Sequence, residues 1–185
     1  MKKSSLVGFS LLFTLIFSLL LTLVACAPSS SSPQVVTLDA SWAEYYTSLS
    51  DLKQHSDIAV RGTISYIAPT VKPANGPVYS MVTVKISQAI WNRHHTPVSP
   101  TITFEQTGGT YNHVTYQVSD DPLFHVGDQV ILFFKEYSPG KYRISGGPTG
   151  RFSIQNGVVR PIVSDGVKLS GSPDASHFAA ELQAS

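Results

Sequence analysis

The chain has 185 residues, of which 42% are hydrophobic and 14% are charged. Its 13 basic and 12 acidic residues nearly cancel, and without Lys2 and Lys3 the balance becomes 11 against 12. A near-neutral chain has no basic surface to attract polyanions, so we expect no nucleic-acid partner. Cys26 is the only cysteine, which excludes an intramolecular disulfide and a metal site built from several thiolates.

The N-terminal residues form a three-part pattern typical of an exported protein. Two lysines stand before an apolar run at 6–24, and Leu23-Val24-Ala25-Cys26 ends it. This ending resembles the lipobox of bacterial lipoproteins, which implies a signal peptide over residues 1–25, cleavage before Cys26 and a diacylglycerol on its sulfur. A retained transmembrane helix is the alternative, because the run is nearly long enough to cross a bilayer. Either outcome puts the rest of the chain outside the cytoplasm, attached to a membrane.

Residues 26–34 are rich in serine and proline, a composition typical of a flexible tether that follows the lipidated cysteine. The remaining chain, 35–185, has the size of a single domain. Ser41 and Glu44 have the spacing of a capping box, in which each side chain accepts a hydrogen bond from the other residue's backbone amide. Apolar residues follow at helical spacing, so we predict a helix over 41–54.

From residue 56 onwards the hydrophobic period changes to two, which predicts β-strands. Gly62 lies in the middle of the first strand, where a bulge or a barrel bend favours glycine. The run at 129–135 is continuously apolar, which predicts a central strand buried on both faces. Asn156-Gly157 is the strongest hairpin signal, since both residues tolerate the positive φ of a type I′ turn. The predicted strands span 58–66, 78–86, 101–106, 129–135, 142–145, 152–155 and 158–162.

A second helix is predicted at the C-terminus. Ser172-Pro173 places a proline at its first position, and Phe178 and Leu182 lie one turn apart, ready to pack the helix on the sheet. Several short strands with one helix at each end predict a mainly β fold. The expected architecture is a small antiparallel OB-like β-barrel with an N-terminal and a C-terminal helix.

Four segments resemble elements of OB-type barrels of the netrin-like class found in bacterial extracytoplasmic domains, and the resemblance covers roughly residues 56–160. It implies a fold rather than an activity, because its motifs are mainly strand and turn patterns. Netrin-like domains generally carry disulfides, which this chain lacks, and a lipidated Cys26 has no free amine to chelate a protease zinc as the inhibitors of that class do. The segments are Ser56–Ile64, Met81–Ile86, Asp121–Asp128 and Gly150–Phe152.

The sequence contains no compact catalytic or metal-binding motif. The adjacent pair His94-His95 would point to opposite faces of a strand, and no histidine pair has the helical spacing of a zinc site. Gly108-Gly109 and the glycines at 146–150 lack the Gly-Lys-Ser/Thr ending of a phosphate loop, so turns explain them better. We therefore expect no metal, no cofactor and no recognisable nucleophile motif.

The long segment between residues 107 and 126 is the strongest candidate for a functional loop. Tyr111, His113 and Tyr116 give it flat amphipathic side chains suited to binding an extracellular protein, peptide or glycan, and Trp91 is a further candidate. Core packing is the alternative role for Trp91, and an edge strand is the alternative for the segment around Tyr116. The predicted function is a membrane-anchored, non-catalytic binding module.

Two other functional classes remain open at this point. An extracytoplasmic hydrolase would use His113 and His125 together with Asp120 or Asp121, and it requires these side chains to converge in one pocket. A structural component of the cell envelope would need no small ligand. An aromatic-lined cavity without such convergence would favour the binding module.

Overall fold

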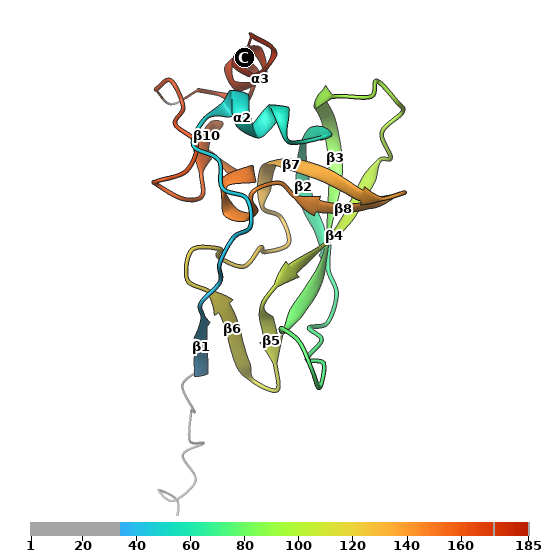
Figure 1. Ribbon diagram of the computed structural model, residues 1–185, viewed down its shortest axis with the longest axis vertical. Coiled ribbons are helices and arrows are strands. Elements are labelled where there is room, and N and C mark those ends of the chain that lie inside the picture. The colour runs from blue at the N-terminus through green and yellow to red at the C-terminus, as the bar shows by residue number, and fades with distance from the viewer. Residues whose placement is uncertain (1–33, 172, 185) are drawn as a thin grey trace, which may run out of the picture. The chain divides into compact units, whose positions relative to one another are not determined.

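The computed structural model describes residues 34–171 and 173–184, which form the mainly β fold of Figure 1. The signal peptide, Cys26 and most of the tether lie outside the described residues. Within the described part, no helix has the length and apolar character needed to cross a bilayer. The elements are β1 (Gln34–Leu38), α2 (Leu49–Gln54), β2 (Ile58–Ile67), β3 (Tyr79–Asn92), β4 (Thr101–Thr107), β5 (Gly109–Tyr111), β6 (Val114–Val118), β7 (Gln129–Ser138), β8 (Lys141–Ile144), η2 (Gly147–Gly150), β9 (Arg151–Gln155), β10 (Val158–Pro161) and α3 (Ala175–Ala184).

Five strands close into a small barrel. The strands pair in the order β7-β2-β3-β4-β8, and an additional pairing of β7 with β8 closes the ring. Only the β4–β8 pairing in this ring is parallel, so the barrel is mixed rather than purely antiparallel. The prediction of a mainly β fold with a small barrel, an N-terminal helix and a C-terminal helix is confirmed. Figure 1 shows α2 and α3 together near one end of the molecule.

Strand β7 is apolar and buried at every position from Val130 to Phe134, and its surroundings explain why. Alternate side chains point to opposite faces of a strand, and the two faces of β7 enter two different cores. Val130, Leu132 and Phe134 belong to the barrel interior. Ile131 and Phe133 belong to a second core, which α2, α3, β9 and β10 help to form. The predicted burial on both faces is therefore confirmed, and β7 joins the barrel to its helical cover.

Two predicted glycine roles are confirmed at the backbone. The pairing of β2 with β3 shifts register between Arg61 and Gly62. A Cβ on Gly62 would stand 2.5 Å from the carbonyl oxygen of Lys85. Asn156 and Gly157 connect β9 to β10 with φ angles of 51° and 80°, as a type I′ turn requires. Gly62 thus lies where a side chain has no room, and Gly157 lies where the turn needs a positive φ.

The predicted N-terminal helix over 41–54 is too long, and its capping box is wrong. Helix α2 begins only at Leu49, where the side chain of Ser48 accepts a hydrogen bond from the backbone of Asp51. Residues before it follow an irregular path because their aromatic side chains have distant partners. In α3 the predicted start at Pro173 is also early. Asp174 instead accepts hydrogen bonds from the next helical amides, and the helix begins at Ala175.

A small three-stranded sheet was not predicted. β1 pairs in parallel with β6, and β6 pairs antiparallel with β5. The segment expected as a long functional loop therefore contains a hairpin. The alternative of a strand around Tyr116 is right, but β6 lies between β1 and β5 and is the central strand of this sheet rather than an edge. Figure 1 shows this sheet at the opposite end of the molecule from α2 and α3.

Candidate functional site

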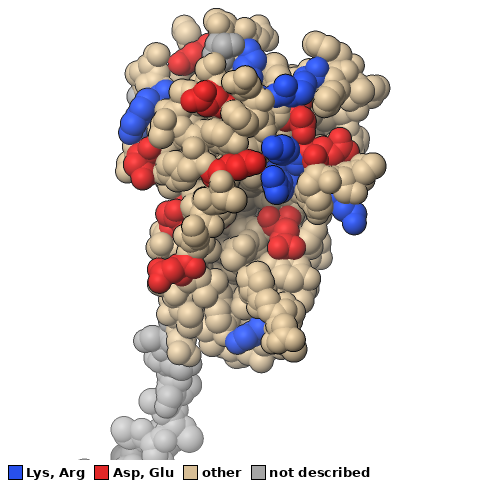
Figure 2. Space-filling view, in the orientation of Figure 1, with Lys and Arg blue, Asp and Glu red and all other residues tan. Residues whose placement is uncertain are grey.

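A pocket of about 240 Å³ lies between the barrel and the segment that precedes α2. Strands β4 and β8 pair only at Phe104 and Tyr142, and the pocket opens where the two strands continue past that pair. Figure 2 shows this side of the molecule hollowed near its centre, with acidic and basic side chains interspersed around it. The lining residues are Trp42, Ala43, Glu44, Glu105, Gln106, Thr107, Asp121, Phe124, Arg143, Ile144, Gly146, Gly147 and Arg151.

Residues 42–46, which we call the strap, form one wall of the pocket. Trp42 Nε1 donates a hydrogen bond of 2.8 Å to Asp120, and the Tyr45 hydroxyl donates one of 2.6 Å to Asp165. The Trp42 ring also packs on Gly147, where a Cβ would stand 2.3 Å from a ring carbon. These long-range contacts replace the helix that the local sequence predicts.

The two glycines before η2 therefore serve as packing surfaces. Gly146 and Gly147 have positive φ, and each faces an aromatic ring of the strap, Tyr46 and Trp42 respectively. A side chain at either position would push the strap away from the barrel. The positive φ angles of both glycines agree with the turn predicted for this segment in place of a phosphate loop.

The inner end of the pocket contains a buried ion pair. Arg151 and Asp121 are 3% and 9% exposed at their side chains, and Arg151 Nη1 contacts Asp121 Oδ1. Arg151 Nη2 also donates to the carbonyl of Pro122 at 2.9 Å, and its guanidinium carbon lies 3.7 Å from the centroid of the Phe124 ring. Burial lowers the pKa of Arg151 to about 9, while the carboxylate favours the charged form. The pair is therefore ionised at neutral pH.

Gln106 fixes the segment that carries this ion pair. Its Nε2 donates to the Pro122 carbonyl at 3.1 Å, and its Oε1 accepts from the backbone N–H of Phe124 at 3.1 Å. The aromatic ring of Phe124 is thereby held against the barrel core, where it meets Phe104 edge-to-face. The inner wall of the pocket is thus built from side chains with fixed partners.

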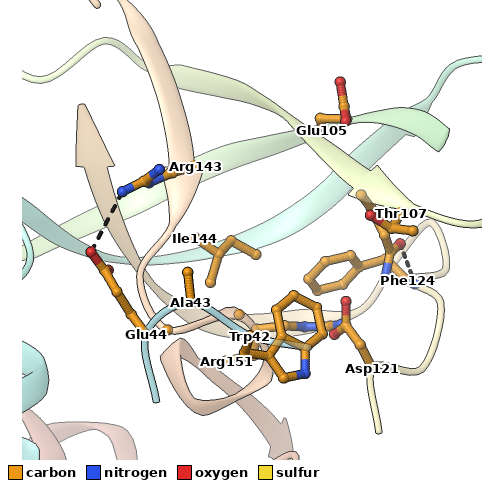
Figure 3. Close-up of a pocket in the computed structure, with 13 residues that line it drawn as sticks. Trp42, Ala43, Glu44, Glu105, Thr107, Asp121, Phe124, Arg143, Ile144 and Arg151 are labelled. Carbon is orange, nitrogen blue, oxygen red and sulfur yellow. Dashed lines mark hydrogen bonds and ion pairs between the residues drawn. The ribbon is translucent and has the colours of Figure 1, made fainter. Parts of the chain in front are cut away.

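The mouth of the pocket carries exposed charges. Glu44 Oε1 lies 3.5 Å from Arg143 Nη2 and 3.4 Å from Lys135 Nζ, and its Oε2 accepts from the Tyr46 hydroxyl at 3.1 Å. Partial burial raises the pKa of Glu44, but the Tyr46 hydrogen bond and the two cations outweigh it and leave the pKa lowered. Glu105 is exposed and has no hydrogen-bond or ion-pair partner among the described residues. Figure 3 shows Arg143 and Glu105 on separate strands at different sides of the cavity.

The structure places the predicted aromatic residues on the hairpin of β5 and β6. Tyr111 is 37% exposed, and His113 occupies the exposed turn with a φ of 63°. Tyr116 is half-buried, and its hydroxyl accepts a hydrogen bond of 2.7 Å from Lys72, whose Nζ also lies 4.8 Å from the ring centroid. The three residues therefore share one hairpin.

Trp91 is not brought to this hairpin. Trp91 and Tyr79 lie near opposite ends of β3. Tyr79 pairs with Thr107, the last residue of β4 before β5, so Trp91 lies at the end of β3 far from the hairpin. Its ring packs partly buried against the second core, and the Arg93 guanidinium carbon lies 5.3 Å from the ring centroid. Core packing, the alternative role given for Trp91 in the sequence analysis, agrees with this position.

The histidines and aspartates proposed for a hydrolase do not converge: His113 occupies the exposed turn between β5 and β6, and the other three have separate partners. His125 is 82% exposed and faces Asp128 at 3.8 Å, whereas Asp121 is buried against Arg151. Asp120 accepts from Trp42. Among the residues that the structure describes, no three side chains of histidine, cysteine or acid gather as metal ligands do.

Sequence reasoning missed the pocket because its residues come from segments far apart in the chain. Trp42 was assigned to a helix face, and Glu44 to a cap, since local spacing says nothing about a partner a hundred residues away. Asp121 and Arg151 do fall within the segments of the netrin-like resemblance, and Asp121 was also a candidate for a hydrolase, but neither signal predicted that the two residues pair. Comparison with protein-family models, curated proteins and solved structures gives no match.

Proposed function

We propose that this chain is a lipid-anchored, extracytoplasmic and non-catalytic binding module that holds a small ligand in the pocket beside the strap. The observation that carries the proposal is the pocket itself, with aromatic and aliphatic walls and a few convergent polar groups. Binding sites for small molecules have this composition. The fixed partners of Trp42, Phe124 and Arg151 hold the walls in place without a ligand, which lowers the entropy lost on binding.

The contacts of the candidate catalytic groups favour binding over hydrolysis. A general base needs to reach the proton that it removes, directly or through one water. His125 faces Asp128 on an exposed loop, while the buried carboxylate of Asp121 is neutralised by Arg151. An ion pair of this kind supports a wall, and it leaves the Asp121 carboxylate engaged rather than free to act as an acid or base.

The location rests on Leu23-Val24-Ala25-Cys26 and the tether that follows it. A diacylglycerol provides two acyl chains, which anchor a protein stably where a single chain does not. Mass spectrometry of the membrane fraction is expected to find a diacylated peptide that starts at Cys26, and Cys26→Ser is expected to remove it. An intact N-terminus in the wild-type protein would contradict the anchor. The netrin-like resemblance stays a prediction.

The hairpin of β5 and β6 is a second candidate contact surface, for a protein, peptide or glycan. Tyr111 and His113 are exposed there, and loops and turns often carry recognition. Replacing Tyr111 and Tyr116 by Ala is expected to weaken the binding of such a partner by about 2 kcal/mol if both are hot spots. A titration in which both forms bind equally would exclude this surface.

The pocket itself is tested by filling it. Ala43 lies exposed on the strap and lines the pocket, whereas Thr47 is exposed on the same segment and does not. A thermal-shift screen with sugars, amino acids, amines and short peptides is expected to find a stabilising ligand for the full chain in detergent. Ala43→Trp is expected to abolish that shift, and Thr47→Trp to preserve it. If no compound shifts the wild-type melt, or if Ala43→Trp changes nothing, the pocket is not a ligand site.

A further inference from the structure

The two sides of the pocket mouth carry opposite net charge. On the β8 side, Glu44 forms ion pairs with Arg143, which lines the pocket, and with Lys135 of β7, which lies beside the lining residues. One positive charge remains in this group of three. On the β4 side, Glu105 is an exposed carboxylate without a partner among the described residues. Salt bridges elsewhere in the pocket do not change this arrangement, because Arg151 and Asp121 neutralise each other. The mouth is therefore dipolar.

The charged groups begin close together. Glu105 and Arg143 directly follow Phe104 and Tyr142, the one paired position of β4 and β8. Backbones of paired strands lie about 4.8 Å apart at that position, so the two side chains start from adjacent strands and then stand at the different sides of the cavity that Figure 3 shows. Arg143 contacts Glu44 through Nη2 at 3.5 Å, and a guanidinium has five N–H donors in all. Arg143 thus has donors left for a second carboxylate.

The interior of the pocket is small and mainly apolar. Trp42, Phe124 and Ile144 surround it, as Figure 3 shows. Its volume of about 240 Å³ is below the range of about 300–1,000 Å³ typical of sites for drug-sized ligands. The ligand that fits is therefore a single small unit with an apolar body, and its polar groups belong at the mouth.

We propose that the pocket binds a free α-amino acid with an aromatic or large aliphatic side chain. The side chain would enter between Trp42, Phe124 and Ile144, the α-carboxylate would bind Arg143, and the α-ammonium would bind Glu105. An amino acid is the small unit that carries opposite charges on one carbon beside an apolar group. A simple amine would leave the excess positive charge near Arg143 unused, and a simple acid would face Glu105. This inference rests on the proposed function of the pocket.

The test compares three probes that share one side chain. Phenylalanine carries both charges, phenylalanine amide only the ammonium, and N-acetylphenylalanine only the carboxylate. Calorimetric titration of the full chain in detergent is expected to show that phenylalanine binds about tenfold more tightly than either blocked derivative, since each loses one charge-assisted hydrogen bond. Equal binding of all three probes would overturn the proposal, as would preference for a blocked derivative.

Two exposed positions separate the two contacts. Glu105→Gln is expected to weaken the binding of phenylalanine about tenfold. The affinity for N-acetylphenylalanine should stay the same, because this probe has no ammonium. Arg143→Gln is expected to weaken the binding of phenylalanine similarly and to leave the affinity for phenylalanine amide unchanged. Asp128→Asn, an exposed carboxylate outside the pocket, is the matched control and is expected to change nothing. If either pocket variant lost the same affinity for all three probes, Glu105 and Arg143 would not bind the ammonium and the carboxylate of the amino acid.

Failure of this inference differs from failure of the proposed function. If a sugar, amine or peptide binds and Ala43→Trp blocks it, while phenylalanine, leucine and tryptophan fail to bind, the pocket is a ligand site for another class and the amino-acid proposal is wrong. If nothing binds the wild-type chain in the thermal-shift screen, both proposals are wrong. Competition between phenylalanine and leucine for one site would support the proposal.

Discussion

At the scale of single residues, the pocket depends on charges that have been removed from water. Arg151 and Asp121 lie almost without exposure beneath Phe124. Desolvation makes such a pair a weak source of net stability, yet removal of one partner is costly because the other charge stays buried and uncompensated. The pair therefore specifies where the Asp121–Phe124 segment is held, which in turn fixes the inner wall of the pocket.

Asp121→Ala is expected to lower the free energy of unfolding by about 3–5 kcal/mol. The loss arises because the Arg151 guanidinium keeps its burial and loses its counter-ion. Arg151→Met combined with Asp121→Leu is expected to cost much less than the sum of the single changes. Urea denaturation measures Asp121→Ala, the two single changes and the double variant, with Asp128→Asn as the control outside the pocket. A loss below about 1 kcal/mol for Asp121→Ala would show that the buried charge is solvated in another way.

Glu44 gives the strap a pH dependence of known sign. Its pKa is lowered from the ordinary value of 4.5 in the folded chain. The contacts of its carboxylate thus stabilise the fold above about that pH, and the stabilisation is lost as pH falls through the lowered pKa. Because Glu44 is partly exposed, we expect a contribution below about 1 kcal/mol. Melting temperatures of wild type and Glu44→Gln are expected to converge in acid. Glu105→Gln, without a partner to lose, is expected to track the wild type across the same range.

At the scale of elements, local sequence patterns predict those structures whose cause is local. The alternation of β2 and β3, the unbroken apolar run of β7 and the Asn156-Gly157 turn each follow from neighbouring residues. The strap does not, since Trp42 packs on Gly147 and bonds to Asp120. β1 likewise forms only because β6 lies beside it. The barrel was therefore predictable, and the pocket, which distant segments build together, was not.

Gly62→Ala tests the element that curves the barrel. The added Cβ would meet the backbone of Lys85 at 2.5 Å, so β2 and β3 would have to separate or shift register. Overpacking of this kind typically costs about 1–3 kcal/mol. Ser65→Ala, an exposed change on the same strand, is expected to stay within about 0.5 kcal/mol of wild type. Equal stability of the two variants in urea would mean that the bulge adapts freely to a side chain.

At the scale of the whole molecule, the barrel and its helical cover are joined through β7. The buried residues of both cores lie between Leu49 and Leu182, and the partly buried Tyr46 of the strap packs against the second core. The strap and β1 attach to this body from the N-terminal side. The pocket thus lies where the first described residues meet the barrel.

A chain shortened to begin at Gln34 is expected to fold on its own, because every residue of both cores is retained. Its thermal unfolding should be cooperative and unchanged by a chelator, since no disulfide is available and we expect no structural metal. A chain that begins at Ala40 loses β1 as well. Because β1 pairs only with β6, the barrel transition should persist while amide hydrogens of β6 exchange faster. A large drop in melting temperature with chelator would reveal a structural metal, and loss of the cooperative transition at Ala40 would make β1 part of the folding core.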